Sequence, residues 1–396
     1  MEVQKKSHTS NLHELTMLVF GVGGCGVQVV KSMTGGWTER FKGYLLDTDS
    51  QMLGGEWDAE GIHLNSRATQ GMSCAGDVAA GRRAVNENRE QLSELCSMAD
   101  LIFIAAGFGG GMGTGGANAL AEIASDAGAL VVGFAAMPFD FEGAERRAIA
   151  KDGLLQFQDA VDGVVMVENQ RLLPWASDKT SIESAFEVVA ETVSKNIRAM
   201  QRLLASPGVV NIDFADVRRA VMNSHGLCTM VCGEASGKGR AELVVKGVLD
   251  HPLFCSRTVL AKASSVIVGV CGGHDLALRE LDCIMTSLGE VLGEHARIKM
   301  GTSVDSTIKD EISLIVLASE ASELGADACM EQRAAITAQT AGEKTESGKK
   351  KARAVQSSLN LDAPGKGRFK DVEPTLRNGE DLDTPTFMRR GIKLRS

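Results

Sequence analysis

The sequence is poor in aromatic residues and in long apolar runs. Phe, Trp and Tyr make up 4% of its 396 residues, and no window approaches the ~18 uncharged apolar residues that a membrane-spanning helix needs. Residues 1–10 are polar and lack the apolar stretch of a signal peptide. We therefore expect a cytoplasmic protein without direct membrane insertion.

Metal-binding cysteine pairs and an excess of positive charge are also missing. The 9 cysteines include no Cys-x-x-Cys pair and show no metal-ligand spacing with the 7 histidines, so we name no metal ligands and expect most of the cysteines to be reduced core residues. The chain holds 51 Asp and Glu against 42 Lys and Arg, a formal net charge of -9. This balance argues against nucleic-acid binding, although residues 321–396 carry 14 basic and 11 acidic side chains.

Short apolar runs alternate with helical patterns from about residue 16 to residue 204. This alternation is typical of βαβ units and predicts a mostly parallel sheet in an α/β domain. A chain of this length also has room for a second domain. The expected elements are strands at residues 16–20, 44–46, 101–105, 130–135 and 163–167, and one long helix at residues 181–204.

The pattern changes after residue 216. Strands expected at residues 265–270, 297–300 and 312–318, around a helix near residues 276–292, predict a smaller, separate α/β domain. Residues 321–379 are rich in small and charged residues and cannot bury enough apolar surface to offset their ordering entropy, so we expect a disordered linker. Apolar residues return at residues 382–390, which indicates a short recognition peptide on a flexible tether.

Two glycine-rich loops follow expected strand ends. Residues 21–26 match G-x-G-x-x-G ahead of a helix expected from Val27, and residues 107–116 are mostly glycine. Such loops present backbone N–H groups and the positive end of a helix to phosphate. Neither loop contains lysine, so backbone amides would neutralise the phosphate charge together with Mg²⁺ held mainly by phosphate oxygens and water. Asp47 and Asp49, at another strand end, either bind a ribose hydroxyl or cap the strand.

Further motifs accompany these loops in an order that few folds would produce. They are Asp47-Thr-Asp-Ser-Gln51, Gly109-Gly-Gly-Met-Gly-Thr-Gly115, Pro138-Phe-Asp-Phe-Glu-Gly-Ala-Glu-Arg146 and Asn211-Ile-Asp-Phe-Ala-Asp216. With these motifs, residues 16–319 and the last peptide resemble the FtsZ family of bacterial tubulin-like division GTPases. Met112 stands where the family's glycine motif usually has Thr, which marks a divergent member.

The resemblance implies an α/β fold of the tubulin/FtsZ type, with a Rossmann-like GTPase domain, a long central helix and a smaller α/β C-terminal domain. The implied cofactors are GTP or GDP together with Mg²⁺. The implied divisions are a disordered N-terminal segment 1–15, a nucleotide-binding domain 16–180, a central helix 181–206, a C-terminal activation domain 207–320, a disordered linker 321–379 and a C-terminal recognition peptide 380–396.

The resemblance also implies a nucleotide site. In it Glu142 and Arg146 contact ribose and phosphate, Asn169 helps to hold the sugar or the base, and Phe186 stacks on guanine. Ala190 stands where the family normally has Asn or Asp. The residues expected at the nucleotide are Gly23, Gly24, Cys25, Gly26, Val27, Gln28, Asp47, Gly110, Gly111, Met112, Gly113, Thr114, Glu142, Arg146, Asn169, Phe186 and Ala190.

By the same resemblance, Asn211, Asp213 and Asp216 form the catalytic segment. Taken from the residues alone, Asp213 and Asp216 stand three apart at a helix start, which also suits two capping acids. GTP hydrolysis needs a group that orients and polarises the attacking water, and neither glycine loop contains one. In the family this group comes from the next subunit of a filament, which implies that polymerisation completes the site.

The resemblance implies two partners. One is a second copy of the chain, joined head to tail in protofilaments of a cell-division ring at midcell. The other is a membrane-anchoring adaptor that binds the tail peptide. The tail residues expected to contact it are Leu382, Pro385, Phe387 and Met388.

Two alternatives to this hypothesis stay open. Met112 and Ala190 suit a family member with weak or no GTP hydrolysis that acts as a scaffold or assembly regulator. A Rossmann-type oxidoreductase would use residues 21–26 but would have no use for the second glycine loop.

Overall fold

The computed structural model describes most of the first 320 residues and four residues of the tail. The described residues are 15–64, 69–177, 180–205, 208–222, 226–253, 256–293, 295–305, 308–320, 376–377 and 380–381. The chain divides into two compact units, residues 1–336 and 337–396. In the second unit, β12 (Leu376–Arg377) and β13 (Glu380–Asp381) form an antiparallel ladder. Residues 1–14, residues 321–375 of the expected linker and residues 382–396 of the expected peptide lie outside the described residues.

Six parallel strands form the first half of one sheet, in the order β3-β2-β1-β4-β5-β6. They are β1 (Met17–Val22), β2 (Phe41–Asp47), β3 (Glu60–His63), β4 (Leu101–Gly107), β5 (Leu130–Met137) and β6 (Gly163–Glu168). Five of them confirm predicted strands and end one or two residues later than expected. The four-residue β3 was not predicted.

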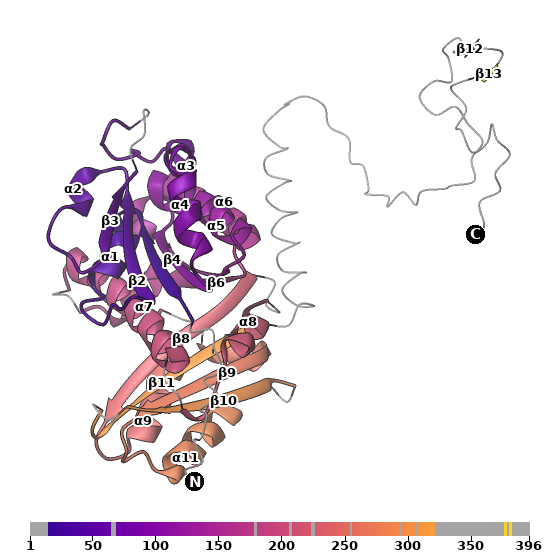
Figure 1. The fold of residues 1–396 in the computed structure, drawn as a ribbon. Coiled ribbons are helices and arrows are strands. Elements are labelled where there is room, and N and C mark those ends of the chain that lie inside the picture. The colour runs from indigo at the N-terminus through magenta and orange to yellow at the C-terminus, as the bar shows by residue number, and fades with distance from the viewer. Residues whose placement is uncertain are drawn as a thin grey trace, which may run out of the picture. The chain divides into compact units, whose positions relative to one another are not determined.

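Side chains along these strands alternate between two buried faces. Met17 and Val19 pack into one apolar cluster, Leu18 and Phe20 into another, and each is at most 2% exposed. Helices cover both faces (Figure 1), as a parallel sheet requires. The first face carries α1 (Gly23–Lys31), α2 (Ser50–Leu53) and α7 (Ile182–Ala205), and the second carries α3 (Val78–Glu87), α4 (Arg89–Ser97), α5 (Ala117–Asp126) and α6 (Ala144–Ala160).

The second half of the sheet is mixed, in the order β8-β11-β9-β10-β7. Its strands are β7 (Gly208–Val210), β8 (Gly226–Ser236), β9 (Ala263–Gly272), β10 (Arg297–Val304) and β11 (Glu311–Glu320), and its helices are α8 (Phe214–Met222), α9 (Arg240–Leu249), α10 (Ser256–Lys262) and α11 (Leu278–Gly289). Three strands and α11 confirm predicted elements. Because β8 pairs with β6, the expected second domain continues the first domain's sheet, which has 11 strands in all (Figure 1).

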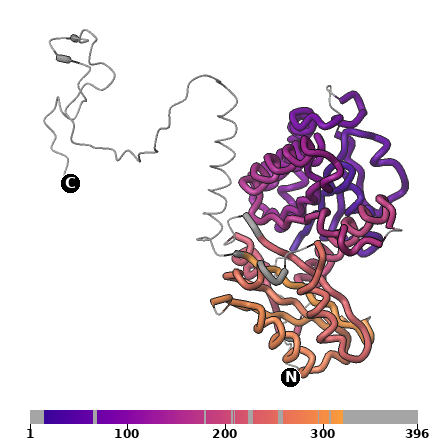
Figure 2. Tube along the Cα trace, turned by 180° about the vertical axis from the view of Figure 1, so that it is seen from behind, coloured from indigo at the N-terminus to yellow at the C-terminus, as the bar shows by residue number. Residues whose placement is uncertain are grey.

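The predicted long helix is α7, whose 24 residues span about 36 Å at 1.5 Å per residue. Its buried stripe repeats at helical spacing, through Val189, Val193, Ile197, Met200 and Leu203. The helix packs against α1 and against β8 to β11, so it runs along both halves of the sheet. Figure 2 shows these two halves of the molecule from behind. Within the described part of the chain, no helix combines the length and apolarity needed to cross a bilayer.

Candidate functional site

The residues predicted for nucleotide binding gather at the carboxyl ends of the parallel strands. The two glycine loops follow β1 and β4, which are neighbours in the sheet (Figure 1). Asp47 ends β2, Glu142 comes after β5 and Asn169 follows β6. Open α/β sheets bind ligands beyond this edge, so the topology unites residues that are far apart in the chain.

The first glycine loop turns directly into α1. The helix begins at Gly23 and not at the predicted Val27, because the glycines take part in its first turn. Gly23 has φ +71°, and an added Cβ would lie 2.9 Å from the backbone N of Gly113, so glycine lets the two loops touch. Val27 is buried, whereas Gly24 and Gln28 are exposed. No acidic residue occupies the first turn, and the positive end of the helix can face an anion.

The second glycine loop continues into a π-helical turn, η1 (Met112–Gly116), and then into α5. The backbone N–H of Gly109 donates to Oγ1 of Thr114 at 2.9 Å, so the threonine hydroxyl shapes the loop from inside. An added Cβ on Gly110 would meet no described atom within 4 Å. Gly110 is therefore where a phosphate can approach the main chain closely.

The side chain of Met112 packs in the core and not on the surface predicted to bind phosphate. Its side chain is 6% exposed and lies against Gly116, where an added Cβ would come 2.5 Å from the methionine Cε. The neighbouring Gly111 packs on Cys74 and on the carbonyl of Asp77. Asp77 caps α3 by accepting from two backbone N–H groups. The loop backbone thus has these packing contacts with methionine at this position.

An ion pair borders the glycine loops. Nε of Arg146 lies 3.0 Å from Oε2 of Glu142, whose Oε1 accepts from the backbone N–H of Phe139 at 2.8 Å. Arg146 packs directly over Gly109. Burial raises the pKa of the Cys25 thiol to about 11, with a further contribution from Glu142. The thiol is therefore neutral and adds no negative charge beside a phosphate.

An aromatic cluster stands at the start of α7. Phe186 meets the ring of Phe139 edge-on at 5.5 Å between centroids, and Phe139 stacks on Phe141, which is 60% exposed. Asn169 is buried, and its Oδ1 has no hydrogen-bond partner in the described residues. Ala190, one turn after Phe186, is 1% exposed and lies in the core. The unpartnered amide oxygen of Asn169 and the half-buried ring of Phe186 each suit contact with a planar, polar ligand.

Asp47 and Asp49 are engaged by the chain itself. Oδ1 of Asp47 accepts from the backbone N–H of Asp49 at 3.0 Å, and Asp49 caps α2 by accepting from the N–H of Gln51. Burial raises the pKa of Asp47 above its usual value. Asp49 thus caps a helix and not the strand, Asp47 is buried at the strand end, and the ribose contact stays a prediction.

The predicted catalytic segment starts α8. Oδ2 of Asp216 accepts from the backbone N–H of Asp213 at 3.1 Å, and Oδ1 of Asp213 accepts from the N–H of Asp216 at 2.9 Å. Oδ1 of Asn211 accepts from the N–H of Gly208 at 2.7 Å. Asp213 is exposed, whereas Asp216 is buried against Lys299 of β10. No sequence motif pointed to Lys299, which lies 83 residues away.

Comparison with known proteins identifies both halves. Residues 16–177 match the Tubulin/FtsZ family, GTPase domain, and residues 226–322 match the FtsZ family, C-terminal domain. The cell division protein FtsZ of Pseudomonas aeruginosa is 32% identical over 372 residues, covering 94% of this chain and 88% of the relative. The chain belongs to the FtsZ family.

Solved structures agree with this assignment. An FtsZ dimer from M. jannaschii matches with a TM-score of 0.70 at 27% identity, over 77% of this chain and 88% of that one. A protofilament of CetZ2 from Haloferax volcanii with GTPγS bound matches with a TM-score of 0.64 at 18% identity, over 82% and 100%. The second likeness supports the fold alone.

The nucleotide-site residues and the acids of this FtsZ-family chain lie in different places. Phe186 is on the first turns of α7, and the acids follow the end of this helix at Ala205. Nineteen residues of helix span about 28 Å. The length of α7 therefore lies between Phe186 and the segment that holds Asp213 and Asp216.

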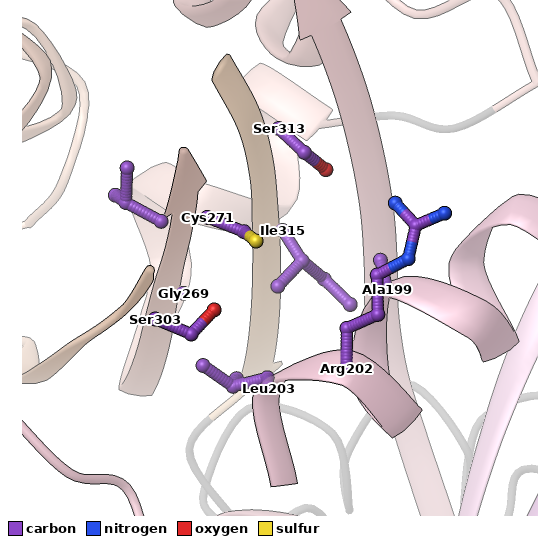
Figure 3. Close-up of a pocket in the computed structure, with 9 residues that line it drawn as sticks. Ala199, Arg202, Leu203, Gly269, Cys271, Ser303, Ser313 and Ile315 are labelled. Carbon is purple, nitrogen blue, oxygen red and sulfur yellow. The ribbon is translucent and has the colours of Figure 1, made fainter. Parts of the chain in front are cut away.

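A small hollow, part of it open to solvent, lies between α7 and the mixed strands (Figure 3). Its lining is Ala199, Arg202, Leu203, Gly269, Val270, Cys271, Ser303, Ser313 and Ile315. None of these belongs to the predicted nucleotide or catalytic set.

Proposed function

We propose that this GTPase assembles head to tail into filaments and hydrolyses GTP where the acid segment of one subunit meets the nucleotide of the next. The observation that carries this proposal is the length of α7, because about 28 Å of helix lies between Phe186 and the end that leads to Asp213 and Asp216. A second copy, placed end to end, supplies them. The FtsZ name of the relative supports a role in a cell-division ring, and we propose a midcell location.

The chain's own groups would bind the nucleotide in three ways. Backbone N–H groups of the two loops and the start of α1 hold the phosphates, with Gly110 at the closest approach. Glu142 and Arg146 border the ribose and phosphates, and the amide of Asn169 gains a partner. Phe186 stacks on the base, a contact worth about 1 to 3 kcal/mol per base.

The residues at the loops fit a Mg²⁺ ion that arrives with the nucleotide. Neither glycine loop carries a lysine or an arginine, and the described residues contain no cluster of three His, Cys, Asp or Glu side chains that could hold a metal. Phosphate oxygens and water would hold such an ion at the glycine loops. When bound, it supplies neutralisation of phosphate charge.

The two acids would orient the attacking water and accept its proton. Asp213 is the exposed member and faces the incoming subunit, while Asn211 fixes the segment through Gly208. The paired caps hold both carboxylates at the start of α8. A head-to-tail partner would cover the exposed Asp213, and the buried Asp216 would support it.

The tail would bind a membrane-anchoring adaptor. In the sequence, Leu382, Phe387 and Met388 stand around Pro385 and are followed by two arginines, a pattern that suits a groove with acidic rims. A pull-down of the adaptor by the tail peptide, lost on Phe387→Ala, would test this partner.

GTP turnover measured against protein concentration tests the proposal, with ATP in parallel and polymer pelleted from each sample. We expect turnover per subunit to rise above a critical concentration with GTP and not with ATP. Turnover that is independent of concentration would remove the role of the acids in trans. Polymer without turnover would favour the non-hydrolysing scaffold.

A further inference from the structure

Lys299 forms a contact that the proposed mechanism does not use. Its Nζ binds Oδ2 of Asp216, although Lys299 lies on β10 and Asp216 on α8. The side chain of Asp216 is 8% exposed, whereas that of Lys299 is 48% exposed. The lysine therefore reaches from the surface onto a carboxylate that has lost most of its contact with water.

A buried carboxylate stays ionised only when other groups replace its hydration. The backbone N–H of Asp213 supplies one hydrogen bond, and Lys299 supplies the charge. Arg219 is the other nearby cation, but its closest nitrogen is 3.9 Å from Oδ1 and its side chain is 72% exposed. Solvent screens such a distant, exposed charge, so Arg219 is a weak substitute.

The orientation of Asp213 depends on this carboxylate. The two acids exchange backbone hydrogen bonds, so a change in Asp216 removes the acceptor of the Asp213 N–H group. We propose that Lys299 is a positioning residue for GTP hydrolysis: its ammonium keeps Asp216 ionised and in place, and thereby keeps Asp213 directed at the nucleotide of the next subunit. This inference rests on the proposed function.

Among the described residues, few charged side chains lie on the elements that pack against Asp216. Burial by itself would raise its pKa, but Lys299 and the cap from Asp213 outweigh burial and hold the pKa below its usual value. Of the strands that pack against α8, β9 carries no charged side chain. The acids of β8 and β11 are Glu234, Glu311 and Glu320, near the strand ends. Without Lys299, the pKa of Asp216 should therefore rise.

The test compares Lys299→Met with the full wild-type chain in pelleting and GTP turnover from pH 5.5 to 8.5. We expect normal polymer, with turnover of Lys299→Met that falls relative to wild type by up to about tenfold for each pH unit below the raised pKa of Asp216 and a gap that closes as the pH increases. Lys299→Arg should keep the wild-type profile. Arg297→Met, an exposed charge lost from the same strand, should match wild type at every pH.

Two results would overturn the inference. A Lys299→Met profile that matches Arg297→Met would mean that the lysine does not act on hydrolysis. A loss that is equal at every pH would indicate a structural role alone.

A second measurement separates this inference from the proposed function. Urea midpoints of Lys299→Met, Asp216→Asn and the double variant should be non-additive, because the two residues are in contact. Additive midpoints would overturn the inference whether or not the wild type hydrolyses GTP. Wild-type turnover without any dependence on assembly would instead overturn the proposed function.

Discussion

In the proposed reaction, the two halves of the sheet contribute different chemical groups. In the parallel half, the site is mainly backbone: Gly23 touches Gly113, and Gly110 leaves open space for a ligand. In the mixed half, the acids are side chains held by other side chains and by caps, as in the contact of Asp216 with Lys299. The two glycine loops offer main-chain groups, whereas the acid segment depends on contacts between side chains.

This difference decides which substitutions each half tolerates. Met112 replaces a threonine expected from the family pattern, yet its side chain turns into the core and leaves the loop backbone available. The mixed half has less freedom, because removing one partner of a buried ion pair leaves the other charge without compensation. We therefore expect divergence at the glycine loops to be compatible with nucleotide binding, and charge loss near α8 to impair hydrolysis.

Mixing two damaged subunits gives the largest expected effect. Asp213→Ala keeps the glycine loops but lacks the acid, and should lose about 10²- to 10⁴-fold in GTP turnover. Gly110→Asp keeps the acids, and its new side chain has room in the folded chain but repels phosphate. A 1:1 mixture should hydrolyse GTP about tenfold faster than either variant alone, because each subunit supplies what its neighbour lacks.

Gly247→Asp is the matched control for the mixture. An added Cβ on Gly247 of α9 also meets no described atom within 4 Å, so the same substitution is placed in open space in the other half. It should bind and hydrolyse GTP normally. Mixtures no faster than the separate variants would mean that the acids act within their own subunit, which breaks the contrast between the halves.

The sequence predicted the parallel half of the fold well because its signals are local. Buried strands read as short apolar runs, and five of them matched. The start of α1 was missed because glycines that close a helical turn look like loop residues. Strands β3 and β7 have 4 and 3 residues, too few for a periodic pattern, and β8 was missed although it joins the two halves.

In the candidate site, too, features with a local sequence signal were predicted and those without one were not. The glycine loops were predictable because a run of consecutive glycines indicates that the backbone approaches a ligand closely. The contact of Lys299 with Asp216 spans 83 residues and leaves no local pattern. The capping role of Asp213 and Asp216 was foreseeable from their spacing of three, whereas the orphaned Oδ1 of Asn169 required the packed structure.

Arg240→Leu tests how tightly the halves are joined. Arg240 is 6% exposed and lies 2.6 to 2.7 Å from Asp275 and Glu280, so its loss should lower the free energy of unfolding by more than the loss of an exposed ion pair does. Since β6 pairs with β8, thermal unfolding followed by circular dichroism should shift as one transition.

The matched control is Arg89→Leu, which removes an exposed ion pair with Asp126 in the parallel half. Such pairs contribute less than about 1 kcal/mol. If Arg240→Leu produces two transitions and shifts one of them, the halves unfold separately and the single sheet does not couple them.

His251 gives the smallest expected effect, on the acid stability of the mixed half. Burial, with a contribution from Lys195 of α7, lowers the pKa of His251 to about 4 from its usual 6.5, and its Nδ1 accepts from the N–H of Leu253. The unfolded chain therefore takes up this proton first, and stability is lost as pH falls from about 6.5 toward about 4. Between pH 7 and pH 5 the loss should be about 2 kcal/mol by proton linkage. His251→Gln should remove this part of the pH dependence in urea unfolding, whereas the exposed His274→Gln should leave it; equal slopes in all three proteins would show that α7 does not hold His251 neutral.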